Sequence, residues 1–482
     1  MGDVIDIIRD IQFSCTGRIS CTCYKNTPVK SSDDVKNKFF VRMQVTNKPG
    51  VLARIASMFG EHKVSISKVI QKVITDGVAE LVIVTEAVKE YHMQDALMHL
   101  REMDTTQEIY LDNSATTRVS KEAAEKALYM MTECYGNPSS LHSKGFAAEK
   151  EMTAAREIIA ERLSAQPGEI YFTSGGTESD NIAILGAAHA KKRAGNKIVT
   201  TAIEHPAVLN TMAQLEKEGF EVVYVQPDAD GNIPKEKFDA AIDAKTILVS
   251  VMAVNNETGV LLPLKDIAGM IKRKKAPALF HTDAVQGFCK IPLQPKKLGV
   301  DLISVSGHKV HAPKGVGALY VKSGVRILPH SFGGGQEKNL RPGTEGVPQI
   351  CAFGEAVKHM MTEKEALTHV KAVQTHLIER LKAMPEVVLN SPENALPYIV
   401  NLSAGRVRAE TMLHFLAERN IFVSSGSACG KAKPSHVLSA MQLPKERVET
   451  SLRISLSAEN TAEEMDAFAD ALKAGLQALS HA

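Results

Sequence analysis

The alternation of short β-branched segments with helical patterns is the feature that most constrains the fold of this chain. It extends from Glu108 to about residue 330 and includes seven strand-like runs: EIYFT, KIVTTAI, EVVYV, TILVSVMAV, ALFHTDA, DLISVS and GALYV. Strands that alternate with helices are typical of a mostly parallel sheet with helices on both faces. The sequence therefore predicts an α/β domain. Residues 365–482 hold a long helical pattern, short strands and a terminal helical pattern, which predict a smaller α+β domain.

Polar residues directly follow five of these predicted strands. In open α/β sheets, ligands bind beyond the carboxyl ends of the strands. Five such endings in succession predict one ligand crevice. The segments are SGGTESDN at 174–181, Glu204-His205, Asn255-Asn256-Glu257, Asp283 with Gln286, and Gly307-His308-Lys309.

The glycine-containing segment predicts an anion site. Gly175, Gly176 and Thr177 lie between a strand and a helix that opens with Glu178. Glycines let the backbone approach a ligand, and a helix N-terminus presents free N–H groups to a phosphate. No lysine follows the glycines, so the segment is not a nucleotide-binding P-loop. A plain tight turn is the alternative interpretation.

Lys309 and Asp283 together favour a cofactor that is held as a Schiff base. Lys309 follows a buried strand, after Ser306 and His308, and a lysine amine forms Schiff bases with aldehydes. Asp283 ends an earlier strand, and a pyridine nitrogen needs a carboxylate that keeps it protonated. With an anion cradle and a histidine able to stack, this set fits pyridoxal phosphate better than a nucleotide. For Lys309 alone, an ordinary surface lysine is the alternative.

From about residue 108 to 480, the chain resembles the cysteine desulfurases. They belong to the class-V aminotransferases and have the fold of type I pyridoxal-phosphate enzymes, a large parallel-sheet domain with a small α+β domain. The resemblance implies a homodimer that takes sulfur from L-cysteine, releases L-alanine and leaves a persulfide on its own cysteine. It rests on nine segments in this order: YLDNSATT, YGNPSSLHSKG, IYFTSGGTESDN, IEHPAVLNT, VNNETGV, HTDAVQ, SVSGHKVHAPKGVGALYV, GGGQEKNLRPGTE and SSGSAC.

The resemblance also implies a role for each matching residue. Lys309 would carry the cofactor, His205 would stack on its ring and relay protons, and Asp283 would pair with the pyridine nitrogen. Arg453, helped by Asn137, would clamp the substrate carboxylate, because a guanidinium fork is the expected way to orient an amino acid. The other implied cofactor contacts are Gln286 and Asn256 at the phenolate oxygen, Gly176, Thr177, Ser306 and His308 at the phosphate, and Thr344 at the phosphate in the partner subunit.

Cys429 is the predicted sulfur-accepting nucleophile. It lies in SSGSACGKAKPS, where small residues predict a loop, and where Lys431 and Lys433 would favour the thiolate. After Cys429 the loop is about two residues shorter than the familiar family form, which reduces its reach by several ångströms. The acceptor of the sulfur therefore stays open: an iron–sulfur scaffold, or an enzyme of tRNA or cofactor thiolation. Three further cysteines lie in apolar or helical surroundings and are predicted to be structural: Cys134, Cys289 and Cys351.

Residues 38–106 form a second predicted unit. Its order is β-α-β-β-α, typical of a ferredoxin-like fold, with Asp76-Gly77 as the hairpin signal and a helix at about 89–103. The segment resembles an ACT domain, most of all the one that ends homoserine dehydrogenases. ACT domains bind amino acids and pair with each other. The resemblance implies an amino-acid sensor with its ligand near the Asn47–Gly50 turn, or a dimerisation or vestigial module. The predicted apolar stripe of its first helix is Val51, Leu52, Ile55 and Phe59.

Composition excludes several other classes of function. Lys plus Arg is 57 and Asp plus Glu is 55, so bulk charge gives no support for direct nucleic-acid binding. No apolar run reaches the roughly 18–20 residues of a membrane span, and the acidic start does not resemble a secretory signal. Seven cysteines in 482 residues favour a reducing cytoplasm over a disulfide scaffold. The spacing of Cys15, Cys21 and Cys23 matches no standard zinc site, and no metal is predicted.

The predicted organisation is a partly ordered leader at 1–37, an ACT domain at 38–106, a large cofactor-binding domain at 107–364 and a small domain with the Cys429 loop at 365–482. Two other functions were weighed against the desulfurase. One is another class-V enzyme, an aminotransferase or a selenocysteine lyase, and Cys429 in a loop argues against a transaminase. The other is a non-catalytic amino-acid- or sulfur-responsive protein on a retired enzyme fold. The presence of Lys309, Asp283 and His205 argues against this second alternative.

Overall fold

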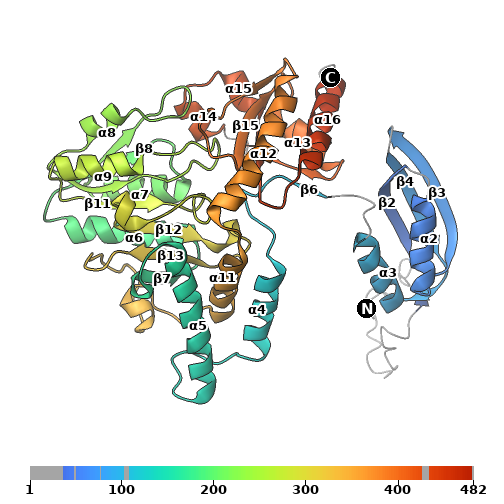
Figure 1. The fold of residues 1–482 in the computed structure, drawn as a ribbon, viewed down its shortest axis with the longest axis horizontal. Coiled ribbons are helices and arrows are strands. Elements are labelled where there is room, and N and C mark those ends of the chain that lie inside the picture. Colours follow the sequence, from blue (N-terminus) through green and yellow to red (C-terminus); the bar gives the residue numbers. More distant parts are fainter. Residues whose placement is uncertain (1–35, 48–49, 76–77, 103–107, 426–433, 480–482) are drawn as a thin grey trace, which may run out of the picture. The chain divides into compact units, whose positions relative to one another are not determined.

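The computed structural model describes residues 36–47, 50–75, 78–102, 108–425 and 434–479. The chain divides into two compact units, residues 1–107 and 108–482, each described here by itself (Figure 1). Cys429 and the three cysteines of the predicted leader lie outside the described residues. Within the described part, no helix has both the length and the apolar character needed to cross a bilayer.

The N-terminal unit is a three-stranded antiparallel sheet with two helices on one face. The strand order is β2-β4-β3, and the pairing of Thr75 with Val78 agrees with the predicted hairpin. Residues on one face of the sheet, among them Leu81 and Ile83, form a single core with both helices. The elements are β1 (Lys36–Asn37), β2 (Phe40–Thr46), α2 (Val51–Glu61), β3 (Ile66–Thr75), β4 (Val78–Thr85), β5 (Val88–Lys89) and α3 (Glu90–Glu102).

The apolar stripe of α2 is narrower than predicted. Val51, Ile55 and Phe59 are buried, since a spacing of four residues keeps them on the face that covers the sheet. Leu52 is 38% exposed, so its place in the predicted stripe was wrong. It follows Val51 directly, and one residue turns the side chain by about 100° around the helix.

The second unit is built around a seven-stranded sheet of order β7-β13-β12-β11-β10-β8-β9. Six strands have the same direction, while β13 is antiparallel to both of its neighbours. The prediction of a mostly parallel sheet is confirmed. Only residues 307–316 separate β12 from β13, too few for a helical crossover, so β13 returns beside β12 as an antiparallel strand. The strands are β7 (Ile170–Thr173), β8 (Lys197–Thr201), β9 (Glu221–Val225), β10 (Thr246–Ser250), β11 (Leu279–Asp283), β12 (Leu302–Ser306) and β13 (Gly317–Val321).

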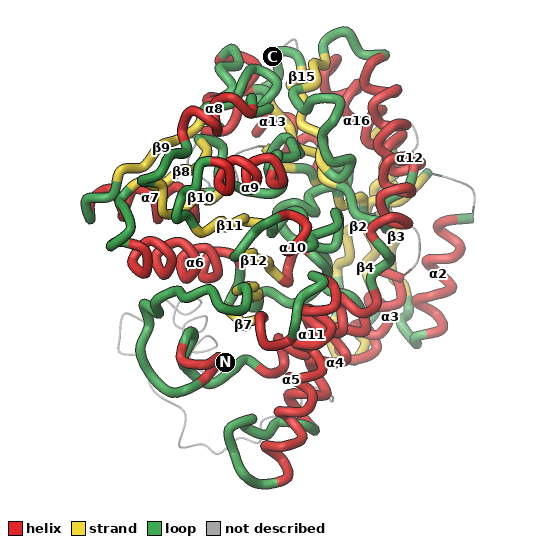
Figure 2. Tube along the Cα trace, turned by 60° about the vertical axis from the view of Figure 1, so that its left-hand side comes forward, coloured by secondary structure: helices red, strands yellow, loops and turns green. Residues whose placement is uncertain are grey.

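Consecutive residues of the central strands enter two different cores. Leu248 and Leu302 pack with α6 and α7 on one face, and Val249 and Ile303 pack with α5, α9 and α11 on the other (Figure 1, Figure 2). Because side chains alternate across a strand, this sheet is covered on both faces. The helices are α4 (Lys121–Thr132), α5 (Ser143–Arg162), η3 (Pro167–Glu169), α6 (Gly176–Lys191), α7 (Pro206–Lys217), α8 (Lys235–Ala241), α9 (Leu264–Arg273), α10 (Pro295–Leu298), η4 (Gly307–Lys309), η5 (Gln336–Asn339) and α11 (Val347–His359).

The C-terminal part of this unit has a four-stranded antiparallel sheet of order β14-β15-β18-β17. The short strand β6 (Ile109–Tyr110), at the start of the unit, pairs in parallel with β16 in this C-terminal part. The remaining elements are α12 (Glu363–Lys382), β14 (Val387–Leu389), β15 (Ile399–Ala404), α13 (Ala409–Ala417), β16 (Ile421–Phe422), β17 (Ser424–Ser425), α14 (His436–Ala440), α15 (Lys445–Glu449), β18 (Ser451–Ser455) and α16 (Ala462–Leu479).

Candidate active site

The five polar segments that the sequence singled out follow β7, β8, β10, β11 and β12. These five strands have the same direction, so their carboxyl ends meet at one edge of the sheet. The polar segments that were predicted to line one ligand crevice therefore meet at this edge of the sheet.

Lys309 ends the turn η4 directly after β12. Its amine donates hydrogen bonds to the backbone oxygens of Ser114, at 2.5 Å, and Ala115, at 2.7 Å. Burial, together with the positive charges of Arg453 and Lys290, lowers the pKa of this amine to about 7. A lysine that is substantially neutral near pH 7 is a competent nucleophile and base.

Asp283 and His205 lie close enough to Lys309 to interact with it electrostatically. Asp283 ends β11, is 7% exposed, and accepts a hydrogen bond from the Val285 N–H at 2.9 Å. Burial raises the pKa of the Asp283 carboxyl. A nearby positive charge would hold such a carboxyl in its ionised form.

His205 is the N-cap of α7, where its Nδ1 accepts a hydrogen bond from the Ala207 N–H at 3.1 Å. Loss of water around the ring lowers the pKa of His205, although the residue as a whole is exposed. Because Nδ1 is an acceptor, the neutral ring carries its proton on Nε2. In that tautomer the Nε2–H group is free to donate a hydrogen bond or a proton at the strand ends.

The helix α6 begins at Gly176, directly after Gly175. Gly175 has φ 151° and ψ −175°, a region that residues with side chains rarely adopt. A Cβ at Gly176 would lie 2.6 Å from Val285 Cγ2, so glycine is needed for this close approach. The nearby Ser306 Oγ is buried and has no hydrogen-bond partner within the described residues. The free N–H groups and this hydroxyl form a polar cradle that suits an anion.

Arg453 lies on β18 and is 4% exposed. It donates hydrogen bonds to Asp112 Oδ1 at 2.8 Å and to the Asn256 backbone oxygen at 3.0 Å. In the described part of the chain, Arg453 Nε and the buried Asn256 Oδ1 have no partner. The arginine is therefore held by two contacts and keeps donor capacity for a further anionic group.

The remaining predicted residues have different surroundings. The Gln286 amide donates to the Ser114 backbone oxygen at 2.9 Å, and His308 Nδ1 lies 3.3 Å from Thr116 Oγ1. Thr177 is exposed in the first turn of α6. Asn137 and Thr344 are exposed in the loops that precede α5 and α11, outside the set of contacts around Lys309. Their roles, and that of Cys429, stay predictions. The burial predicted for the structural cysteines is confirmed for Cys134, Cys289 and Cys351.

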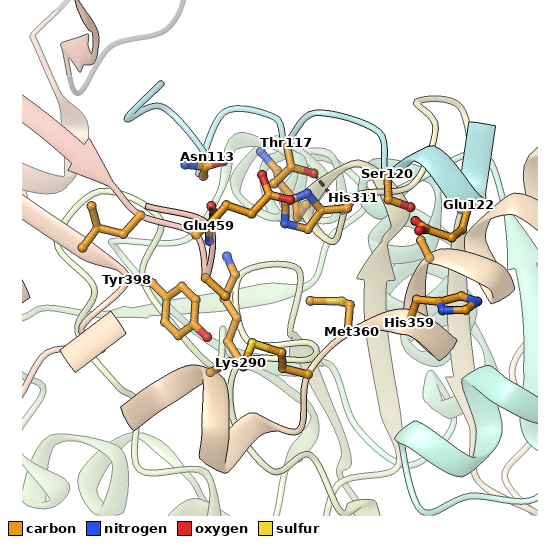
Figure 3. A pocket seen from close by; sticks show the side chains of 17 residues that line it. Asn113, Thr117, Ser120, Glu122, Lys290, His311, His359, Met360, Tyr398 and Glu459 are labelled. Carbon is orange, nitrogen blue, oxygen red and sulfur yellow. Dashed lines mark hydrogen bonds between the residues drawn. The ribbon is translucent and has the colours of Figure 1, made fainter. Parts of the chain in front are cut away.

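Lys309 is among the residues that line a cavity of about 320 Å³. Figure 3 shows this cavity with Lys290 and Tyr398 at its wall. Lys290 also lines it, 5% exposed, with its amine 3.3 Å from Gln286 Oε1 and 5.4 Å from the centre of the Tyr398 ring. Burial lowers the pKa of Lys290 to about 8. The cavity is not lined by Asp283, His205 or Gly176. Of the polar residues at the strand ends, Lys309 is the one that also lines the cavity.

Sequence reasoning missed two charged residues around the cluster, Lys290 and Asp112, and gave Glu204 no role beyond its place in a polar segment. Lys290 lies four residues after Gln286, a spacing that could have indicated their contact. Asp112 lies within the quoted YLDNSATT segment, but nothing local shows that it pairs with Arg453. Glu204 precedes His205 and is fully buried, and burial raises its pKa to about 8. Its carboxyl accepts hydrogen bonds from Thr201 Oγ1 at 2.7 Å and from the Met252 N–H at 3.0 Å.

Comparison with known proteins gives the family. Residues 109–468 match the class-V aminotransferases, and residues 39–103 match the ACT domain. The chain therefore belongs to the class-V aminotransferase family and carries an ACT domain before the enzyme unit. The predicted fold class and the predicted resemblance are both confirmed.

Curated relatives within that family include cysteine desulfurases. The cysteine desulfurase IscS of Clostridium botulinum is 45% identical over 369 residues, which cover 74% of this chain and 92% of the relative. IscS of Methanosarcina thermophila is 44% identical over 362 residues, 74% of this chain and 89% of that one. A solved NifS-like protein has a TM-score of 0.72 at 38% identity and covers 77% of this chain and 100% of its own. A structure described as SspA in complex with cysteine has a TM-score of 0.65 at 37% identity, over 73% and 100%.

Proposed function

We propose that this chain is a cysteine desulfurase that moves sulfur from L-cysteine to its own Cys429 with pyridoxal phosphate bound at Lys309. L-cysteine and the Cys429 thiol give L-alanine and a Cys429 persulfide, so the atoms balance without an external oxidant. The observation that carries the proposal is the Lys309 amine, with its pKa near 7, in electrostatic contact with Asp283, His205 and Arg453.

The surroundings of Lys309 fit this cofactor. Two buried polar atoms without partners in the described residues, Ser306 Oγ and Asn256 Oδ1, match its phosphate and its phenolate side. The cradle at Gly176 suits a phosphate, and Asp283 suits a protonated pyridine nitrogen. When bound, pyridoxal phosphate supplies an electron sink that stabilises negative charge on the substrate Cα. We propose that Thr177 and His308 also contact the phosphate and that Gln286 contacts the phenolate oxygen. His205 would stack on the ring, and Thr344 would contact the phosphate of the cofactor in the partner subunit.

The chain's own residues divide the remaining work. Lys309 binds the cofactor as a neutral amine and, once freed by substrate, moves a proton at Cα as a base. His205 keeps a proton on Nε2 and can donate it. Arg453 orients the substrate carboxylate, with help from Asn137. Because its guanidinium is bound to Asp112 at 2.8 Å, the substrate competes with this carboxylate or shares the arginine with it.

The test uses the full chain with L-cysteine and a reducing thiol. Lys309→Ala should abolish formation of alanine and sulfide. Cys429→Ala should still bind the cofactor and L-cysteine but form no protein persulfide in mass spectra. Cys134→Ala is the matched control, since this cysteine is free, buried and assigned no chemistry, and it should form the persulfide normally. Alanine production by Lys309→Ala, or a persulfide mapped to Cys134 or Cys351, would refute the assignment.

We further propose that the persulfide is passed to a sulfur-acceptor protein in the cytoplasm, either an iron–sulfur scaffold or a thiolation enzyme. Three cysteines of the described chain are free thiols, which agrees with a reducing compartment. Incubation of the persulfide form with each class of acceptor, labelled with ³⁵S from cysteine, distinguishes the two. Transfer of label to neither class would contradict this part of the proposal.

The enzyme unit is proposed to act as a homodimer through α4, α5 and their connection. This region exposes an apolar group that a soluble monomer rarely leaves uncovered: Leu128, Tyr129, Met131, Tyr135, Leu141 and Phe146. Light scattering after size exclusion should give a dimer for the native chain and a monomer for a Leu128→Asp, Phe146→Asp variant. Val388→Asp, on the separate strand β14, is the matched control and should stay dimeric. A native monomer would refute the proposal.

The ACT domain is proposed to bind an amino acid near the Asn47–Gly50 turn. Asn47 is exposed there and accepts a hydrogen bond from the Gln71 amide at 3.2 Å. Kinetics with and without threonine, methionine and cysteine should be compared for the full chain and for a chain that lacks residues 1–105. A response confined to the full chain supports a sensor. Identical responses support a module that only aids association.

A further inference from the structure

Three metal-ligating side chains come together in the N-terminal unit, on residues given no role above. His62 caps the C-terminal end of α2, and Asp95 and His99 lie four residues apart on α3. One ligand atom from each side chain lies within 4.8 Å of those of the other two. In the part of the chain that the structure describes, this is the one group of three or more His, Cys, Asp or Glu side chains with such spacing.

The apolar core of the unit holds the two helices that carry this group. Ile55 and Phe59 of α2 and Met93 and Ala96 of α3 are at most 1% exposed and belong to one core cluster. The helix backbones are therefore fixed by packing against a common sheet. The three polar side chains are half-buried or exposed, so small rotations can adjust their positions at low cost.

The hydrogen bonds around the group orient both imidazoles. His99 Nδ1 lies 2.9 Å from the Asp95 backbone oxygen, so Nδ1 carries a proton and Nε2 keeps a free lone pair. A metal-binding histidine usually donates its other N–H to a carbonyl or carboxylate in this way. The Asp95 carboxylate reaches both rings, 2.7 Å from His62 Nδ1 and 3.8 Å from His99 Nδ1. The ring centres are 4.4 Å apart.

We propose that His62, Asp95 and His99 bind a divalent transition-metal ion, with Zn²⁺ as the best match. Two imidazoles and one carboxylate suit Zn²⁺, whereas Ca²⁺ and Mg²⁺ select oxygen ligands. Bonds of about 2.0–2.1 Å in a tetrahedron place ligand atoms about 3.4 Å apart, so side-chain rotation has to close the present spacing by up to about 1.4 Å. Three protein ligands leave the fourth position to water.

Equilibrium dialysis of the full chain against Zn²⁺ tests the site. The chain is first stripped with a chelator, and its thiols are alkylated so that cysteines do not bind the ion. The double variant His62→Ala, His99→Ala should bind one Zn²⁺ per chain fewer than the native protein, and Asp95→Asn should bind it at least about tenfold more weakly. His92→Ala is the matched control on the same helix. The His92 ring is tilted by 41° against the Tyr91 ring, with ring centres 4.1 Å apart, and its loss should leave Zn²⁺ binding unchanged.

Co²⁺ added to the cofactor-free chain provides a second measurement. The native protein should show visible ligand-field absorption with the intensity of a tetrahedral site, and the double variant should not. Circular dichroism of both proteins checks that the substitutions leave the fold intact. Equal Zn²⁺ stoichiometry in the native and double-variant chains would overturn the proposal, and so would an equal loss in His92→Ala.

Discussion

The state of the Lys309 amine leads to a prediction about pH. An ordinary lysine with a pKa near 10.4 is neutral in only about one molecule in 2,500 at pH 7. Burial beside two other cations lowers the pKa of Lys309 to about 7, so about half of the molecules carry the neutral amine at that pH. The neutral fraction is therefore roughly 1,250-fold larger than for an ordinary lysine. We expect the reactivity of this amine to rise with pH and to level off above about pH 7.

Competitive acetylation of the cofactor-free chain with limiting acetic anhydride measures this directly. Labelling of the Lys309 peptide across pH 5–11 should have its midpoint near pH 7, with exposed lysines of the same chain as internal reference. Lys290→Met removes one of the charges that lower the pKa of Lys309, so its midpoint should move to higher pH. A midpoint near 10 in the native chain, or no movement in Lys290→Met, would refute the electrostatic reasoning.

Two further substitutions test packing and charge in the enzyme unit. Gly176→Ala should weaken retention of pyridoxal phosphate, because the added Cβ would lie 2.6 Å from a valine methyl group and such overpacking costs about 1–3 kcal/mol. The control is Gly269→Ala, where the added Cβ meets open space. Spectroscopic titration with the cofactor compares the two variants. Glu337→Gln should lower the free energy of unfolding by about 3–5 kcal/mol in urea titration, because it leaves the Arg156 charge, now 2.6 Å from Glu337, without its buried partner. Glu125→Gln breaks an exposed pair and should cost at most about 1 kcal/mol. Equal cofactor retention in Gly176→Ala and Gly269→Ala would contradict the packing argument. Equal losses of stability in Glu337→Gln and Glu125→Gln would contradict the charge argument.

Local sequence patterns predicted the parts of the fold that depend on neighbouring residues. β-branched runs, strand endings and the spacing of Val51, Ile55 and Phe59 are visible within a few residues, and they located the sheet, the edge where the polar segments meet, and the helix face. The alternation of strands and helices does not predict the direction of β13. That direction follows from the short connection after Lys309, which makes β13 antiparallel to β12.

Contacts between distant segments could not be predicted in the same way. The pairing of Asp112 with Arg453 joins two ends of the enzyme unit, and neither residue has a local signal that names the other. The surroundings of Lys309 depend on the backbone oxygens of Ser114 and Ala115, whose positions follow from the whole fold. The family resemblance supplied the roles of these sites, while the structure supplied the contacts that set their charge.

The pairing of β6 with β16 has a consequence for any signal from the ACT domain. Residue 107 ends the N-terminal unit, and two residues later Ile109 pairs with Ile421. Asp112, three residues further on, holds the arginine proposed to grip the substrate. The chain that follows the N-terminal unit therefore enters the enzyme unit at a strand pair close in sequence to Asp112, the partner of Arg453. Five residues of chain separate the end of the N-terminal unit from Asp112, so the point of fusion lies close in sequence to the contact that holds Arg453.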